Sequence, residues 1–500
     1  MLVLPFDNRS GNVNLNWIGD SFPDTLNQRL SSVGFLSISR DDRAFAFDHL
    51  GLPADFRPTR ATTLRIAQTL DANYVVVGSY NVADAGKPTA HISVQAQVLD
   101  VNALKLSPVL SDSTALSDLF HVENATAWKV ARQIDPKFSV AEQTFRAASG
   151  AIGLSAFENY IRGTDATTPE ERTKRLELAV GEAPGYAAAQ VALGKELYAD
   201  RKYDRAAAVL AKVAHSNRLA LEANFYLGLA RFNSAKYAEA ESAFTFVASR
   251  LPLPEVVNDE GVALARQDKS GTVFFQRASN ADPNDGDYRF NLALSHYRHG
   301  DLAAAKREVD EARKLLPKDA ETAALKSALD SGRSYTTEAA AGFDATERLR
   351  RTYSEASFRQ AAFQLDQVRA MHFATLPPEQ RAAKYIQTGR DYLAQGLLPE
   401  AEQEFQSAIT ADPHSAAAHT GLAMVREQSG SPNEARAQAE ISLQFKPSAD
   451  AYLVLARLDL AKPDPSAAAL EVKNALQLEP KNAAALALKQ RIVSQGAKRP

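Results

Sequence analysis

The pattern of apolar and polar positions divides the chain into two parts. From about residue 150 onward, alanines and larger apolar residues recur three and four positions apart. This spacing is typical of amphipathic helices. Before about residue 115, short apolar runs and alternating stretches indicate strands as well as helices. The pattern therefore predicts a mixed domain followed by a long helical region.

The helical region carries an internal repeat. One copy runs from Gly389 through Ala401, Phe405 and Ala408 to Pro413. Other copies begin at a small residue in the same position: Gly228, Ala293, Ala423 and Ala456. Closing prolines of neighbouring copies lie 33 or 34 residues apart (480 − 447 and 447 − 413). A small residue lets a second helix pack closely against the first, and a proline ends each unit.

We call this recurring set of small, aromatic and proline positions the ladder. It resembles the tetratricopeptide repeat, whose unit is a helix–turn–helix of 34 residues. Weaker copies contain Gly194 and Gly261, and the first copy retains Leu176 and Ala179. Residues 481–494 resemble the terminal capping helix that such arrays need. The resemblance implies a helical solenoid whose first helices line a concave surface that holds protein or peptide partners.

The ladder fails between Pro317 and Lys384. Residues 331–334 read as a loop, and Ala345–His372 has the apolar stripe of a long helix or a broken pair of helices. We interpret the gap either as a helical insertion, which would act as a hinge, or as two eroded repeats. A basic stretch in this gap, Arg348, Arg350, Arg351 and Arg359, favours a solvated helix face over contact with an acidic partner.

The first 115 residues predict a mixed sheet. Strands are expected at residues 2–6, 35–39, 74–80, 92–98 and 105–116, with helices around residues 18–33 and 64–70. Helices at 120–134 and 140–148 lead into the repeats. The fold class is α+β overall: an N-terminal mixed-sheet α/β domain followed by an α-helical tetratricopeptide-type solenoid.

The N-terminal part also resembles the TolB amino-terminal-like domain, which is related to the CsgG and FlgO envelope proteins. The matching stretches are residues 4–8 with Ser10-Gly11, Gly19-Asp20, residues 73–79 and residues 92–100. Here Ser79-Tyr80 replaces the charged residue that the family usually carries after this strand. The resemblance implies a non-catalytic domain in a bacterial envelope setting.

Five segments follow from these patterns. We expect a TolB N-terminal-like domain at 1–115, a helical connector at 116–150, a first repeat array at 151–330, a helical insertion or eroded repeats at 331–383, and a second array with a capping helix at 384–500.

Composition narrows the possible functions. The net charge of −3 gives no strong field for nucleic acid, and the absence of cysteine excludes disulfides and Cys-type zinc sites. No apolar run reaches the ~20 residues of a membrane helix, so no transmembrane segment is expected. A strand that starts at Met1 favours a natural start further upstream, with an export signal and a periplasmic location; a start at Met1 would favour the cytoplasm.

Candidate chemical groups have simpler explanations. His296 and His299 share a helix face, but no third zinc ligand has suitable spacing. Asp7 and Asp20 occupy turn and helix-start positions that acids normally take. Phosphate-loop, dinucleotide, zinc-protease and nucleophile-elbow motifs are missing. We therefore predict no catalytic, cofactor-binding or metal-binding residues.

Polar residues on the first helices of the repeats are the candidate contacts for a partner: Asn224, Arg231, Arg289, Asn291, His296, Lys384, Gln387, Arg390 and Asp391. The favoured function is a non-enzymatic scaffold in a bacterial envelope. Two alternatives stay open, a cytoplasmic regulatory subunit whose α/β domain binds a small ligand, and a catalytic α/β domain with repeats that present substrate. The sequence leaves the oligomeric state open.

Overall fold

A computed structural model describes residues 1–53, 56, 58–147, 152–336, 345–351, 364, 367–462 and 465–496. The chain forms two compact units. Residues 1–154 and 363–500 make up unit 1, and residues 155–362 make up unit 2. Within the described ranges, every helix is too short or too polar to cross a membrane.

Unit 1 begins with a mixed sheet. The short strands β1 (Leu2–Val3) and β2 (Asp7–Asn8) pair in parallel with β3 (Tyr74–Ala83). β3 pairs antiparallel with β4 (His91–Asp100), which in turn pairs with β5 (Lys105–Leu106) and β6 (Leu110–Ala115). The mixed sheet that alternating and continuous apolar runs predict is confirmed.

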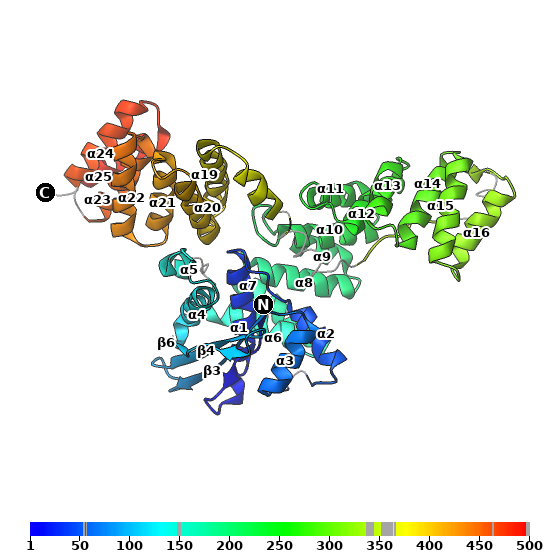
Figure 1. Cartoon of the computed structure of the whole chain (residues 1–500), viewed down its shortest axis with the longest axis horizontal. Coiled ribbons are helices and arrows are strands. Elements are labelled where there is room, and N and C mark those ends of the chain that lie inside the picture. Colours follow the sequence, from blue (N-terminus) through cyan, green and yellow to red (C-terminus); the bar gives the residue numbers. More distant parts are fainter. Residues whose placement is uncertain are drawn as a thin grey trace. The chain divides into compact units, whose positions relative to one another are not determined.

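Helices cover this sheet. α1 (Trp17–Ser31) packs on α4 (Leu119–Ile134), which lies along β4 and β6 (Figure 1). α2 (Arg40–His49) and α3 (Arg60–Thr69) enclose an apolar cluster together with β1 and β3.

The strand expected at residues 35–39 is wrong. The Phe35 amide donates to the Leu30 carbonyl at the end of α1, and the Ile38 amide donates to the Met1 carbonyl. Residues 35–39 therefore do not form a strand of the sheet. Ser39 instead starts α2 through a capping box with Asp42.

Unit 2 is a stack of antiparallel helix pairs. Its helices are α6 (Leu154–Asp165), α7 (Pro169–Glu182), α8 (Ala187–Ala199), α9 (Tyr203–Leu210), α10 (Ala220–Asn233), α11 (Tyr237–Ala248), α12 (Pro254–Ala265), α13 (Thr272–Ala281), α14 (Gly286–Arg298), α15 (Leu302–Leu315) and α16 (Ala320–Asp330). Figure 1 shows α14, α15 and α16 following one another as a stack.

Unit 1 ends in a second stack. It contains α19 (Pro378–Ala394), α20 (Leu398–Ala411), α21 (Ala416–Gln428), α22 (Pro432–Phe445), α23 (Ala449–Ala461), α24 (Pro465–Leu478) and α25 (Ala483–Gly496). The expected solenoid of helix pairs is confirmed in both stacks.

Small residues fix the distance between paired helices. A Cβ atom on Gly228 would lie 2.6 Å from Cε1 of Phe244, and one on Gly389 would lie 3.0 Å from Cε1 of Phe405. In both pairs the aromatic ring sits 16 residues after the glycine and is fully buried. A larger side chain would force the helices apart, which explains the small residue in the repeat.

Residues 345–351 form neither a helix nor a strand. The helix expected to begin at Ala345 is therefore wrong for this stretch. Its backbone groups bond to side chains of α12 and α14 instead of to each other. The remainder of the expected helix lies largely outside the described residues.

Candidate functional site

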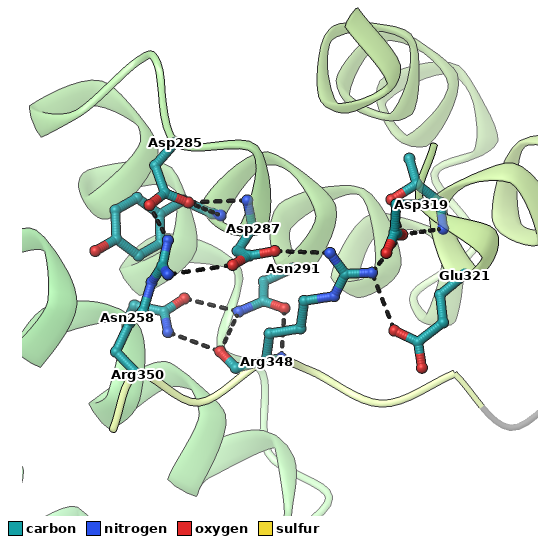
Figure 2. Close-up of polar contacts among 10 residues, drawn as sticks. Asn258, Asp285, Asp287, Asn291, Asp319, Glu321, Arg348 and Arg350 are labelled. Carbon is teal, nitrogen blue, oxygen red and sulfur yellow. Dashed lines mark hydrogen bonds and ion pairs between the residues drawn. The ribbon is translucent and has the colours of Figure 1, made fainter. Parts of the chain in front are cut away.

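Residues 345–351, here called the docked segment, run as an extended stretch across α12, α14 and the start of α16 (Figure 2). We call the surface formed by these three helices the α12–α14 face. The segment has the sequence Ala-Thr-Glu-Arg-Leu-Arg-Arg. It lies within unit 2, so a stretch of this chain occupies the first-helix surface on which the sequence places its partner.

Two buried asparagines hold the main chain of the segment. The Arg348 amide donates to Oδ1 of Asn291 at 2.7 Å. Its carbonyl accepts from Nδ2 of Asn291 and from Nδ2 of Asn258, both at 2.9 Å. The two asparagines also bond each other at 2.7 Å, and both are fully buried. The pair is thus a rigid, desolvated clamp for one peptide unit.

A third main-chain contact lies two residues further along. The Arg350 amide donates to Oδ1 of Asp259 at 2.7 Å. Complete burial raises the pKa of Asp259 well above its usual range, although hydrogen bonds from Arg350 and Asn258 lower it. Asp259 and Asn291 each lie two residues before the small residue of their repeat, Gly261 and Ala293. Equivalent positions on neighbouring repeats therefore hold alternate amides of the segment.

The Arg348 side chain meets three carboxylates. Its guanidinium lies 2.7 Å from Asp287, 2.5 Å from Asp319 and 3.0 Å from Glu321 (Figure 2). The same group stacks over the Phe290 ring at 4.0 Å. Burial alone would raise the pKa of Asp319, but hydrogen bonds from Thr322 and Arg348 lower it to about 2. This carboxylate is therefore ionised at neutral pH.

The Arg350 side chain is held in a similar way. It pairs with Asp285 and lies 3.2 Å from Asp287, while its guanidinium covers the Tyr288 ring at 5.1 Å. Asp285 caps α14 by accepting from the Asp287 and Tyr288 amides. The helix cap thus fixes one oxygen of this carboxylate and leaves the other for the arginine.

The other side chains of the segment are also specifically bound. Glu347 is 4% exposed and pairs with Arg298 at 2.5 Å, with Arg266 at 3.7 Å. The Ala345 carbonyl accepts from Arg298 at 2.8 Å. Leu349 packs on the cluster of Val262, Phe275 and Leu292. Arginine and glutamate on the segment therefore face opposite charges on the repeats.

The sequence-based candidates in unit 2 have different surroundings. Asn291 holds the segment, as described. Asn224 is buried and bonds its own helix at Ala220. Arg231 and Arg289 pair with Glu239 and Glu308 on the following helices, and His296 lies 3.9 Å from Asp301.

The candidates in unit 1, Lys384, Gln387, Arg390 and Asp391, all lie exposed on α19. Gln387 bonds Asp391 one turn along the same helix at 3.0 Å. The structure therefore brings together only Asn291 with the docked segment, among the nine candidates.

Sequence reasoning missed most of the site. Asn258, Asp259, Asp285 and Asp287 on the repeats, and Arg348 and Arg350 on the segment, were not chosen as contacts. The prediction of a solvated helix face is wrong for Arg348 and Arg350, because the segment is not helical and both side chains are paired with carboxylates. Arg351 is exposed but not helical, and Arg359 lies outside the described residues. One available signal was the amide or carboxylate two residues before the small residue in consecutive repeats.

The other candidate chemical groups have ordinary surroundings. Metal ligands do not cluster in the described parts of the chain. There, no three histidines, aspartates or glutamates come together in a way that could hold a metal ion. His299 bonds the Ser295 carbonyl of its own helix at 2.7 Å. Asp7 lies in β2 and Asp20 in the first turn of α1.

A second polar cluster lies in unit 1. Residues 139–144, around the start of the short helix α5 (Glu142–Ala147), dock against α20 and α21. Glu402 is fully buried, accepts from the Ala141 amide at 2.9 Å and from the Thr144 hydroxyl, and pairs with Arg426 at 2.7 Å. Burial raises the pKa of Glu402, although Arg426 and these hydrogen bonds lower it. This cluster joins the connector to the second stack.

Comparisons with known proteins agree with the fold. A family model described as tetratricopeptide repeat matches residues 191–250 and 386–450. Putative adenylate cyclase 3 from Rhizobium meliloti (strain 1021) is 24% identical over 197 residues, which cover 38% of this chain. The chain spans about a third (31%) of the length of that relative.

Two solved structures are similar to parts of the chain. MamA from residue 41 to its end, from Desulfovibrio magneticus RS-1, is 20% identical with a TM-score of 0.32 and covers 34% of this chain and 99% of its own. YrrB, described as a TPR protein with an unusual peptide-binding site, is 14% identical with a TM-score of 0.27 and covers 49% of this chain and 96% of its own. The family-model match identifies residues 191–250 and 386–450 as tetratricopeptide repeats, and neighbouring helices of both stacks are paired in the same way.

Proposed function

We propose that the chain is a non-enzymatic scaffold that holds another protein on the first repeat array. The observation that carries this proposal is the clamp on the Arg348 peptide unit by Asn258 and Asn291. These hydrogen bonds are made to a main-chain amide and carbonyl, which are present in every polypeptide. A surface of this kind binds an extended stretch of protein, and side-chain contacts then select its sequence.

Burial strengthens the proposal. With the segment in place both asparagines are fully buried, so water does not compete for the hydrogen bonds that hold the Arg348 peptide unit. Asp259 is buried in the same way and accepts from the Arg350 amide. Repeat packing alone does not require three adjacent polar groups with this geometry, whereas a bound polypeptide does.

The wider setting is also a proposal. The resemblance of residues 1–115 to the TolB amino-terminal-like domain supports a docking module in a bacterial envelope. On this view, residues 116–150 connect that module to the repeats, the arrays span 151–330 and 384–500, and residues 331–383 supply the docked segment. The cyclase activity in the name of the Rhizobium relative belongs to a protein of which this chain spans about a third.

Affinity capture with the full chain tests the scaffold proposal. We expect a specific protein to be captured by the wild type and to be lost when Asn291→Ala removes one arm of the clamp. Gln380→Ala, at another exposed position of α19 that is not a candidate contact, is the matched control and should capture the same protein. Capture that is equal for the wild type and Asn291→Ala, or turnover of a substrate with no Asn291-dependent partner, would contradict the proposal.

A further inference from the structure

The docked segment presents two arginines at alternate positions to a row of acidic side chains. Arg348 meets Asp287, Asp319 and Glu321, and Arg350 meets Asp285 and Asp287. Asp287 contacts both guanidinium groups and so fixes their spacing along the peptide. In an extended stretch, side chains two residues apart project to the same side, so one acidic row can read both.

Aromatic rings complete both arginine sites. Phe290 lies under the guanidinium of Arg348, and Tyr288 lies under that of Arg350, two residues apart on α14. A planar guanidinium can stack on a ring and pair with carboxylates at its edge at the same time, whereas a lysine ammonium cannot fill both roles. The two sites therefore select arginine over lysine.

On the opposite side of the segment, arginines of the repeats contact a glutamate. Arg298 donates to Glu347 and to the Ala345 carbonyl, and Arg266 lies near the other oxygen of Glu347. The Leu349 position rests on an apolar cluster. Read along the segment, the face accepts a glutamate, an arginine, an apolar residue and a second arginine.

We propose that the α12–α14 face recognises an extended peptide of a partner protein with the pattern Glu-Arg-x-Arg, where x is apolar, and that the docked segment is an internal competitor for this site. The inference rests on the proposed function and adds to it the chemistry of the partner and a built-in block. The segment occupies the main-chain contacts at Ala345, Arg348 and Arg350 and both arginine sites, so a partner of this chemistry binds only after the segment leaves.

A tethered competitor raises the concentration of partner that is needed. A ligand on the same chain cannot diffuse away from its site, so its effective concentration is high. An external peptide of the same sequence must compete with the segment. Its apparent affinity is its intrinsic affinity multiplied by the fraction of sites that the segment has left. Weakening the segment without changing the face should reverse this loss.

The test measures binding of a fluorescent peptide that copies residues 345–351, with blocked ends, to the full chain by anisotropy. The released variant carries Arg348→Ala with Arg350→Ala and keeps the whole α12–α14 face. Lys306→Ala with Arg307→Ala is the matched control, because it removes two exposed cations of α15 from the same unit. Circular dichroism of each variant establishes that its helices are intact.

We expect the released variant to bind the peptide at least about tenfold more tightly than the wild type and the control do. Adding Asp287→Asn to the released variant should lower this affinity, and a peptide with alanine in place of both arginines should not bind. A peptide with lysine at both positions should bind more weakly than the arginine peptide.

Two results would overturn the inference in different ways. Equal affinity of the wild type and the released variant would contradict internal competition. Failure of the released variant to bind the arginine peptide, while Asn291-dependent capture of a partner persists, would contradict the Glu-Arg-x-Arg pattern and leave the scaffold proposal standing. Loss of both peptide binding and Asn291-dependent capture would contradict the proposed function itself.

Discussion

The two repeat arrays share a packing ladder but differ at the positions that hold a peptide. In the first array, the repeats of Gly261 and Ala293 carry Asp259 and Asn291 two residues before the small ladder residue, and both bind main-chain amides, whereas the repeats of Gly194 and Gly228 carry Ala192 and Tyr226 there. In the second array, the same positions are Gln387, Gly421 and Val454. Gln387 is exposed, a Cβ on Gly421 would lie 2.2 Å from Phe405, and Val454 is buried in the core.

The second array uses a different surface. Its buried polar cluster lies between α20 and α21, where Glu402 and Arg426 hold the connector at residues 141–144. The comparison teaches that the small and aromatic residues of the ladder set the fold, while a few polar residues beside them decide what each array holds.

Removing the buried acid of the second array should have the largest effect on stability. Glu402→Ala removes the buried partner of Arg426, which is 10% exposed and keeps only the exposed Glu434 at 3.1 Å, and it removes an acceptor for Ala141 and Thr144. We expect unit 1 to lose about 3–5 kcal/mol of unfolding free energy. Trp17 and Trp128, the two tryptophans of the chain, lie in unit 1, so urea unfolding followed by their fluorescence reports on this unit.

The exposed residue Glu379 on α19 supplies the control. Glu379→Ala should change the unfolding free energy by less than about 0.5 kcal/mol. A loss from Glu402→Ala as small as that of Glu379→Ala would show that the connector cluster does not stabilise the second array.

The clamp should matter in the first array only. Asn291→Ala removes three hydrogen bonds, two to Arg348 and one to Asn258, at about 0.5–1.5 kcal/mol each. We expect hydrogen exchange of residues 345–351 to become at least about tenfold faster. Gln387→Ala, at the same position of a second-array repeat, should leave exchange unchanged in both arrays. Similar effects of the two substitutions would remove the proposed difference between the arrays.

A pH series should affect unit 1 through Glu123. This carboxyl is buried between α1 and α4, and burial raises its pKa to about 8, although hydrogen bonds from Ser21 and Thr25 lower it. The folded state therefore binds the proton more tightly than the unfolded state does, whose pKa is about 4.3. The stability from this group is complete below pH ~4.3 and is lost as the pH rises toward about 8, by up to ~1.4 kcal/mol per pH unit.

Tryptophan fluorescence again measures the effect, as the difference in unfolding free energy between the wild type and Glu123→Gln. This difference should change steadily across the range and then level off above about pH 8. A difference that is constant with pH would mean that Glu123 is ionised in the folded protein, contrary to the burial argument.

Salt should have the smallest effect, and only on the first array. Arg348 and Arg350 form ion pairs in which the side chains are 18% and 31% exposed, so ions in solution screen them in part. Between about 0.05 and about 0.5 M salt, exchange of residues 345–351 should become roughly two- to fivefold faster. No change would indicate that the main-chain clamp alone holds the segment.

Much of the fold follows from local pattern. The ladder from Gly389 to Pro413 predicts helix pairs because packing distance and helix ending are set by residues within one repeat. The stretch at residues 35–39 alternates like a strand, but the capping box between Ser39 and Asp42 and the end of α1 determine its conformation.

The site is less predictable than the fold. The docked segment looks helical by itself, yet its conformation depends on Asn258 and Asn291, which lie 90 and 57 residues away in the sequence. Asp285 and Asp319 occupy ordinary helix-cap positions in the sequence. Their ion pairs with Arg350 and Arg348 depend on the tertiary structure and cannot be predicted from local pattern. The position of Asn291 on a first helix of a well-formed repeat predicts a partner contact, and that role stays a prediction; in the structure Asn291 binds the docked segment of the same chain.

The most direct test of the central claim uses the absence of cysteine in the chain. Ala345→Cys places one thiol on the docked segment, at a position that is 5% exposed, and Val273→Cys places one at a position of α13 that is 68% exposed. The account predicts that a thiol reagent labels the first variant much more slowly than the second. It also predicts that excess peptide of residues 345–351 speeds labelling of the first variant alone. Equally fast labelling of both variants without peptide would contradict the claim that the segment occupies the α12–α14 face.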